Sequence, residues 1–265
     1  MRVVWLTDLH LNFLPPDAIA RFLAVLSREP ADAVLLTGDV AEAPSVAEML
    51  GEISQSIACP VYFVLGNHDF YFGSIAEVRR DVTALCRQDP RLVYLTASDV
   101  VELTPTLGLV GHDGWADARL GDYERSLVMM NDYKLIEELA GYNKRDRWPV
   151  LKSLGDAAAE HVRQVLPAAL DRYPRVVLLT HVPPFREACW HEGELSNGEW
   201  MPHFTCQAVG EALEETMRHR PDRELTVLCG HTHSSGECWP LPNLHVVTGG
   251  AKYGEPAIAM SLEIE

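Results

Sequence analysis

Short apolar runs rich in β-branched residues alternate with longer segments of helical period along most of this 265-residue chain. Buried strands of a parallel sheet have continuous apolar sequences of this kind, because helices cover both faces of the sheet. The pattern therefore predicts an α/β protein. The expected strands cover residues 3–7, 33–37, 61–65, 107–111, 176–180, 225–229, 244–248 and 258–264, and helices are expected over 17–27, 45–57 and 75–86.

The segment from residue 115 to 173 interrupts this alternation. Charged and aromatic residues mix there, and no good strand is present. Helical spacing at 120–139 and 151–170 predicts two helices, with Pro149 as the breaker between them. We interpret residues 1–265 as a single domain that carries a helical insertion, or lid, at 115–173.

The charge balance restricts the possible partners. The chain has 22 Lys and Arg against 38 Asp and Glu, a net charge of −16. Binding to long nucleic acid relies on clustered cations, which this sequence lacks. No stretch approaches the ~18 apolar residues needed to cross a bilayer, and the start of the sequence lacks the pattern of a signal peptide. We expect a cytoplasmic protein that does not bind membranes.

Residues of types that commonly bind metals follow directly after five of the expected strands. Parallel strands bring their carboxyl ends to one edge of a sheet, where α/β proteins bind ligands. Glycines at Gly38, Gly66 and Gly230 allow tight exits from three of these strands. The residues concerned are Asp8, His10, Asp39, Asn67, His181, His231 and His233.

Seven such side chains exceed the needs of one metal ion. Mixed nitrogen and oxygen donors without thiolates suit Mn, Fe or Zn, and they argue against a cysteine-lined structural zinc site. Two divalent ions that share one carboxylate, about 3.5–4 Å apart, would use the whole set. Such a centre would also attract an anionic substrate despite the negative net charge.

Five sequence blocks in this order resemble those of the calcineurin-like metallophosphoesterase superfamily. The resemblance spans residues 8–233 and implies a four-layer α/β/β/α sandwich of two mixed sheets, with a dinuclear metal site at one edge. The blocks are Asp8-x-His10, Gly38-Asp39, Gly66-Asn67-His68-Asp69, His181 and Gly230-His231-x-His233.

The resemblance also implies how the side chains divide between the metals. Asp8, His10 and His233 would bind the first ion, Asn67, His181 and His231 the second, and Asp39 both. The two cations would neutralise phosphate oxygens and activate a bridging hydroxide, which attacks phosphorus in line. His68 adjoins a ligand without being one, so we expect it to assist the leaving group as the catalytic acid. Asp69 is expected to cap the following helix or, as the alternative, to orient His68.

Departures from particular subfamilies narrow the expected substrate. The arginines of the serine/threonine protein phosphatases are absent beside Asp39 and Asn67, and His10 stands where purple acid phosphatases have glycine. The pattern is similar to small bacterial phosphoesterases and cyclic-nucleotide phosphodiesterases. We expect hydrolysis of a small phosphomonoester or phosphodiester, with a cyclic-nucleotide phosphodiesterase as the alternative. The acidic balance disfavours a nuclease, and His68 disfavours a noncatalytic protein-binding module.

Three further residues are expected to contact substrate. His112 and Asp113 follow the strand at 107–111, and Tyr71 follows the third block. An aromatic ring at Tyr71 could stack on an organic group. A loop-rich stretch at 183–204 is also expected to contribute to the pocket wall, through Trp190, His191, Trp200 and His203.

Overall fold

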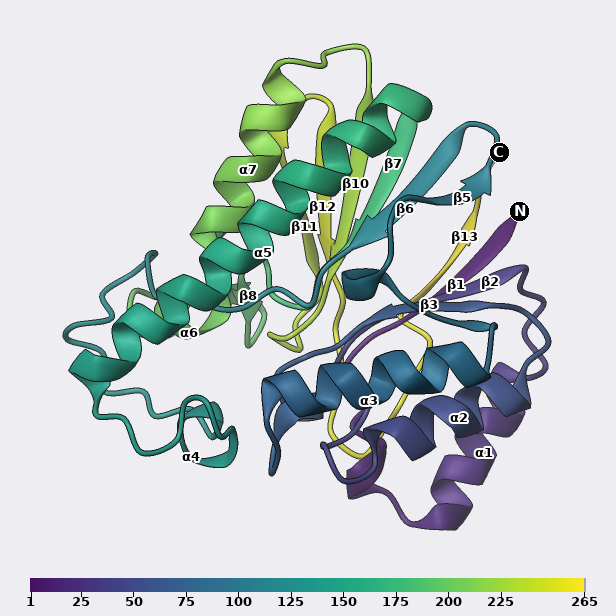
Figure 1. The fold of residues 1–265 in the computed structure, drawn as a ribbon, viewed down its shortest axis with the longest axis horizontal. Helices are drawn as coiled ribbons and strands as arrows, with labels where there is room; N and C mark the ends of the chain where they lie inside the picture. The colour runs from purple at the N-terminus through teal and green to yellow at the C-terminus, as the bar shows by residue number, and fades with distance from the viewer. Residues whose placement is uncertain (265) are drawn as a thin grey trace.

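The computed structural model describes residues 1–264, which form two packed sheets with helices on the outer faces (Figure 1). Strands β1 to β4 of the first sheet are parallel, and β13 is antiparallel to β1. The order in this sheet is β13 (Met260–Glu263), β1 (Arg2–Leu6), β2 (Ala33–Thr37), β3 (Val61–Val64) and β4 (Leu92–Tyr94).

The second sheet has six strands and is also mixed. Its four central strands are parallel, and each edge strand runs antiparallel to its neighbour. The order is β11 (Gly236–Leu241), β12 (Leu244–Thr248), β10 (Glu224–Cys229), β7 (Arg175–Leu179), β6 (Leu107–Gly111) and β5 (Val101–Thr104).

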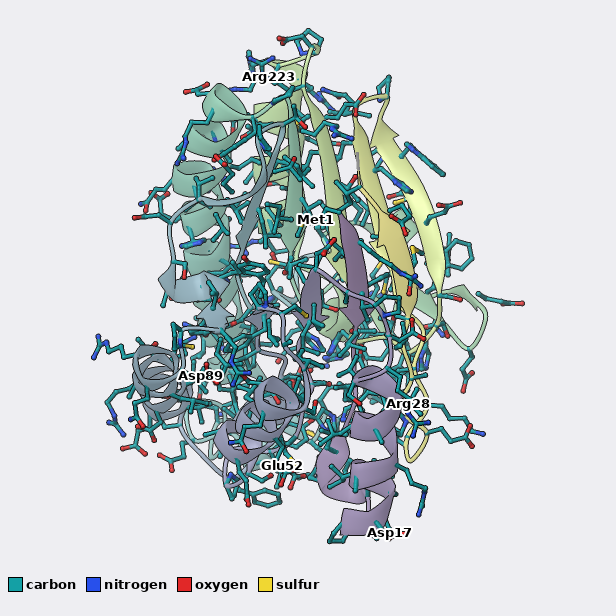
Figure 2. All side chains as sticks on the ribbon, turned by 90° about the vertical axis from the view of Figure 1, so that its right-hand side faces the viewer. Met1, Asp17, Arg28, Glu52, Asp89 and Arg223 are labelled. Carbon is teal, nitrogen blue, oxygen red and sulfur yellow. The ribbon has the colours of Figure 1, made fainter. Side chains whose placement is uncertain are left out.

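Helices cover the outer face of each sheet. On the first sheet lie α1 (Pro16–Leu26), α2 (Val46–Ser56) and α3 (Ile75–Gln88), and on the second lie α5 (Lys144–Arg172) and α7 (Gln207–Arg218) (Figure 1). Arg223, before β10, and Asp17, in α1, accordingly lie at opposite ends of the molecule (Figure 2). The predicted four-layer α/β/β/α sandwich is confirmed.

Side-chain alternation along β1 explains the layering. Val4 and Leu6 pack against the helices of the first layer, while Val3 and Trp5 pack between the two sheets. Successive strand residues point to opposite faces, so one strand with apolar residues throughout contributes to two cores. Burying each such side chain stabilises the fold by about 1.5–3 kcal/mol.

The spacing of apolar residues along α1 likewise determines which face of the helix is buried. Ile19, Phe22 and Leu26 are buried, and their spacing places them on one face of the helix. Pro16 occupies the start, where a missing backbone N–H costs nothing and the fixed φ favours helix.

The expected strands are present with shifts of one or two residues at their ends. The two large sheets also contain β4, β5 and β11, and the edge strands β5 and β11 are only partly buried. Their sequences therefore lack the continuous apolar run that marks a buried strand.

Two expectations for the inserted segment were wrong. No helix covers 120–139, where only the short α4 (Asp132–Leu135) forms, and Pro149 does not separate two helices. Instead α5 continues through Pro149, because burial of its face, including Leu151, Val162 and Leu166, outweighs the local cost of about 3 kcal/mol for an interior proline. The second half of α5 is thus part of the outer helical layer.

Smaller elements complete the part of the chain described. Short 3-10 turns lie at Leu11–Phe13, His68–Phe70, Leu95–Ala97 and Arg186–Ala188, and a hairpin of β8 (Trp190–His191) and β9 (Glu194–Leu195) precedes α6 (Met201–Phe204). Among residues 1–264, no helix combines the length and apolar character required to span a membrane.

Candidate metal centre

The carboxyl ends of β1, β2, β3, β7 and β10 meet at one edge of the sandwich, and the residues that follow them converge there. Contacts among their side chains connect all seven predicted ligands. They form two adjoining groups with Asp39 between them.

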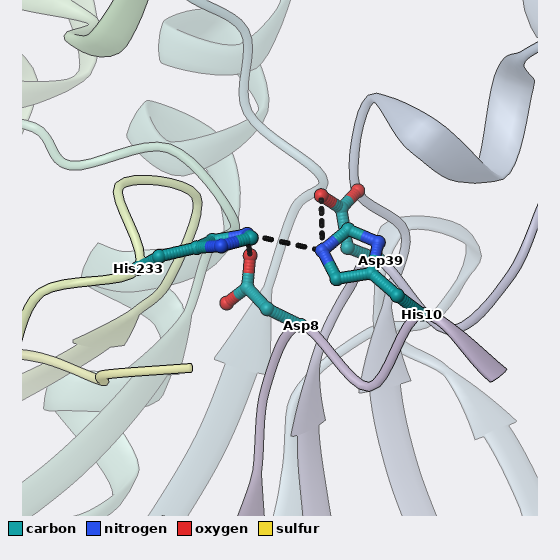
Figure 3. A group of neighbouring side chains, drawn as sticks. All are labelled: Asp8, His10, Asp39 and His233. Carbon is teal, nitrogen blue, oxygen red and sulfur yellow. Dashed lines mark hydrogen bonds and ion pairs between the residues drawn. The ribbon is translucent and has the colours of Figure 1, made fainter. Parts of the chain in front are cut away.

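Asp8, His10, Asp39 and His233 make up the first group (Figure 3). One potential ligand atom from each lies within 4.8 Å of those of the other three. His10 Nε2 is 3.0 Å from His233 Nε2, and His233 Nε2 is 3.4 Å from Asp8 Oδ1. All but His233 are buried.

Asn67, His181 and His231 make up the second group. Asn67 Oδ1 lies 3.0 Å from His181 Nε2 and 2.9 Å from His231 Nδ1, and the two ring nitrogens are 3.2 Å apart. Asp39 Oδ2 is 3.4 Å from His181 Nε2 and 3.7 Å from His10 Nε2. A single carboxylate oxygen therefore faces both groups.

Strained backbone supports this arrangement. Asp8, His10, Asp39, His231 and His233 all have φ between 46° and 72°, the left-handed region that non-glycine residues rarely adopt. Such strain persists only where the surrounding structure enforces it, and it is common at functional sites.

Gly66 explains how the turns come so close together. A Cβ at this position would collide with the Asp39 carboxylate and with the His181 ring. The absence of a side chain there lets the turn after β3 approach the turn after β2, as the sequence predicted.

Asp69 holds the same two turns together and does not cap a helix as expected. Its carboxylate accepts hydrogen bonds from the backbone N–H groups of Asp39, Val40, Ala41 and Gly66, at 2.8–2.9 Å. These bonds fix the position of Asp39 through its main chain.

Hydrogen bonds behind the histidines orient their donor nitrogens. His181 Nδ1 donates to the carbonyl of Thr37 at 2.7 Å, and His231 Nε2 donates to the carbonyl of His203 at 3.0 Å. The opposite nitrogen of each ring therefore faces Asn67. Partners of this kind fix the orientation of ligating histidines in metal sites.

The charge balance of the group favours a bound cation. Burial lowers the pKa values of His10 and His231 to about 4, so both rings are neutral at pH 7. Burial also disfavours the charged form of His181, but the Asp39 carboxylate outweighs it and raises the His181 pKa to about 10. A proton held at His181 thus offsets carboxylate charge, and a divalent ion would supply positive charge at the same place.

Asn67 is oriented by a residue that the sequence did not indicate. Asp132, at the start of α4, accepts a 2.9 Å hydrogen bond from Asn67 Nδ2 and a 2.6 Å bond from the hydroxyl of Tyr71. With its NH₂ group held there, Asn67 presents its oxygen to His181 and His231. No motif in the sequence links Asp132 to this site.

His68 lies beside the groups without joining them. Its backbone N–H donates to Asp39 Oδ1 at 2.8 Å, and its ring stacks on Tyr71 with centroids 4.2 Å apart. Tyr71 is only 3% exposed, so it supports His68 and Asn67 from behind, away from the cavity.

The structure does not bring His112 and Asp113 into the metal centre. Asp113 is 1% exposed, and its carboxylate pairs with Arg79 at 2.9 Å while it accepts bonds from Leu65 N–H and the Tyr94 hydroxyl. His112 is buried beside it. Asp113 thus connects the end of β6 with the first sheet and α3, while the His112 ring lies 5.1 Å from the ring of His161 in α5.

A cavity of about 180 Å³ opens beside the two groups. Its lining includes predicted wall residue His191, whereas His203 is buried behind His231. The loop after β12 also reaches this edge of the sheets, and it supplies Tyr253, a lining residue that the sequence analysis did not identify. Besides site residues, the cavity is lined by Met130, His191, Phe204, Thr232 and Tyr253.

Comparison with known proteins agrees with this geometry. The family model for calcineurin-like phosphoesterases matches residues 1–235, and a search of curated proteins gives no match. Phosphopantetheinyl hydrolase from Mycobacterium tuberculosis is similar in structure, with a TM-score of 0.62 and 17% identity over 94% of this chain and 89% of that one. A dimetal phosphatase from Danio rerio has a TM-score of 0.56 and 15% identity over 94% and 87% of the two chains.

The family implies a dinuclear divalent metal centre, and the clustered Asp and His side chains provide a candidate site for it. The region matched by the family model, residues 1–235, contains all seven predicted metal ligands. The chain therefore belongs to the calcineurin-like phosphoesterase family and is a metal-dependent phosphoric ester hydrolase.

Proposed function

We propose that this protein hydrolyses a small phosphomonoester or phosphodiester at a centre of two divalent ions, with Mn, Fe or Zn as the metals. The observation that carries the proposal is the placement of Asp39, one oxygen of which faces both ligand groups. Bound ions would neutralise phosphate charge and lower the pKa of a water molecule.

The side chains would divide as the two groups do. Asp8, His10 and His233 hold the first ion, Asn67, His181 and His231 hold the second, and Asp39 contributes to both. All donors are nitrogen or oxygen atoms, which suits these divalent ions and leaves the thiols of the chain unused.

His68 protonates the leaving oxygen in this proposal. Its ring lines the cavity, and none of the close donor contacts within the two groups involves it. The Asp39 carboxylate anchors its backbone, and Tyr71 supports one face of the ring. A group within reach of substrate but outside the ligand set can transfer a proton without releasing metal.

The size of the cavity supports a small substrate. A volume of about 180 Å³ is below the 300–1,000 Å³ typical of pockets for drug-sized ligands. Of the proposed lid at 115–173, Met130 reaches the cavity and Asp132 contacts Asn67, so we assign substrate selection to its first part, 115–143.

Metal-loaded protein assayed on p-nitrophenyl phosphate and bis-p-nitrophenyl phosphate tests the proposal and separates monoesterase from diesterase activity. His68→Ala should keep two bound ions by elemental analysis and lose most turnover. Two bound metals without turnover of either ester, or of phosphorylated metabolites and cyclic nucleotides, would refute it.

A further inference from the structure

We infer that Tyr253 is a substrate-binding residue, whose hydroxyl donates a hydrogen bond to the ester oxygen that leaves phosphorus. This inference rests on the proposed function and adds a residue outside the region of 1–235 that the family model matches. Tyr253 lies in the loop after β12 and lines the cavity at the metal centre.

Rings of the site hold Tyr253 in place over the first ligand group. Its ring centroid lies 4.4 Å from that of His10 and 4.7 Å from that of His233. Phe13 packs against it edge-on at 5.5 Å. Aromatic packing on several sides fixes the direction of the phenol, although the residue is 51% exposed and thus accessible to substrate.

The hydroxyl lies beside the catalytic acid of the proposed function. Tyr253 Oη is 3.4 Å from His68 Nε2. Two donors at this separation can share one acceptor, because an oxygen about 2.8 Å from each fits between them on the cavity side. The phenol would then stabilise the oxygen to which His68 transfers a proton, in the manner of donors that line an oxyanion hole.

Within residues 1–264, the cavity offers no Arg or Lys side chain that could stabilise the leaving oxygen in place of Tyr253. The Tyr253 hydroxyl can supply a hydrogen bond to such an oxygen, because a phenol O–H is both a donor and an acceptor.

Tyr253→Phe tests the inference, because it removes the hydroxyl and keeps the packed ring. Tyr142→Phe, at a half-exposed tyrosine that does not line the cavity, is the matched control. Loss of a hydrogen bond to an oxygen that gains negative charge predicts a drop of roughly 10- to 100-fold in kcat/KM for phenyl phosphate. The drop should be smaller for p-nitrophenyl phosphate, whose leaving group needs less stabilisation.

A binding measurement gives a readout independent of turnover. Titration calorimetry with inorganic phosphate should show weaker binding to metal-loaded Tyr253→Phe than to Tyr142→Phe, at unchanged metal content and unchanged thermal unfolding. The inference is overturned if the two variants hydrolyse phenyl phosphate equally, if both esters lose the same factor, or if Tyr253→Phe loses metal. A metal-loaded wild-type protein that hydrolyses neither phosphomonoesters nor phosphodiesters would instead refute the proposed function.

Discussion

Replacing Asp132 with alanine should selectively weaken the second metal site. Asp132 is 6% exposed and contacts no ligand atom that faces a metal position. It accepts hydrogen bonds from Asn67 Nδ2 and the Tyr71 hydroxyl, and these bonds keep the Asn67 oxygen directed at His181 and His231. Without Asp132, the amide can turn its NH₂ group toward the two ring nitrogens.

The size of the effect follows from the hydrogen bonds lost. A hydrogen bond to a charged acceptor contributes about 1.5–3 kcal/mol, and each 1.4 kcal/mol changes an affinity tenfold. Returning the amide to its ligating orientation should therefore weaken binding of the second ion by about 10- to 100-fold. This range agrees with the effects of removing outer partners of metal ligands in other proteins.

Calorimetric titration of metal-free protein with Mn²⁺ would separate the two sites. Binding of one ion should be unchanged, because the contacts among Asp8, His10, Asp39 and His233 do not involve Asp132. Tyr71→Phe, which leaves the bond between Asn67 and Asp132 in place, should have a smaller effect. Two ions bound to Asp132→Ala with wild-type affinities would refute the reasoning, provided that its thermal unfolding shows it to be folded.

Three other substitutions test separate parts of the structure. Asp39→Ala should abolish binding of both ions by elemental analysis, and retention of either would contradict its position between the groups. Asp113→Ala leaves Arg79 without its buried partner and should lower the free energy of unfolding in urea by about 3–5 kcal/mol at unchanged metal content; a loss below about 1 kcal/mol would refute this role. Burial lowers the pKa of His112 to about 3. Between pH 6.5 and 3 the unfolded chain therefore binds one proton more than the folded chain, and the free energy of unfolding decreases as the pH is lowered. The stability of wild type relative to His112→Asn should decrease by about 2 kcal/mol from pH 7 to pH 5, and no decrease would show that His112 titrates normally.

The convergence of the seven predicted metal ligands could be predicted because it depends on local sequence. Apolar runs identified the strands, and the polar residues directly after them had to lie at the carboxyl edge of each sheet. The structure confirmed the sandwich, and it brought Asp8 and His233 together across most of the chain.

Buried polar residues were harder to interpret. Asp113 follows a strand as the predicted ligands do, but its carboxylate forms an ion pair with Arg79 and accepts a hydrogen bond from the Tyr94 hydroxyl. Tyr71 was expected at the substrate and instead stacks under His68. A residue type after a strand shows what chemistry is possible, and only the neighbouring side chains decide which partner it takes.

By itself, the sequence determined the alternation of strands and helices, the edge of the sheets that carries the site, and the donor atoms available there. The tertiary structure decided which distant loops complete that site: Asp132 behind Asn67, and Tyr253 beside His68. The physical reason is that strand and helix signals repeat over a few residues. The path of a loop depends instead on packing against segments that are far away in the chain.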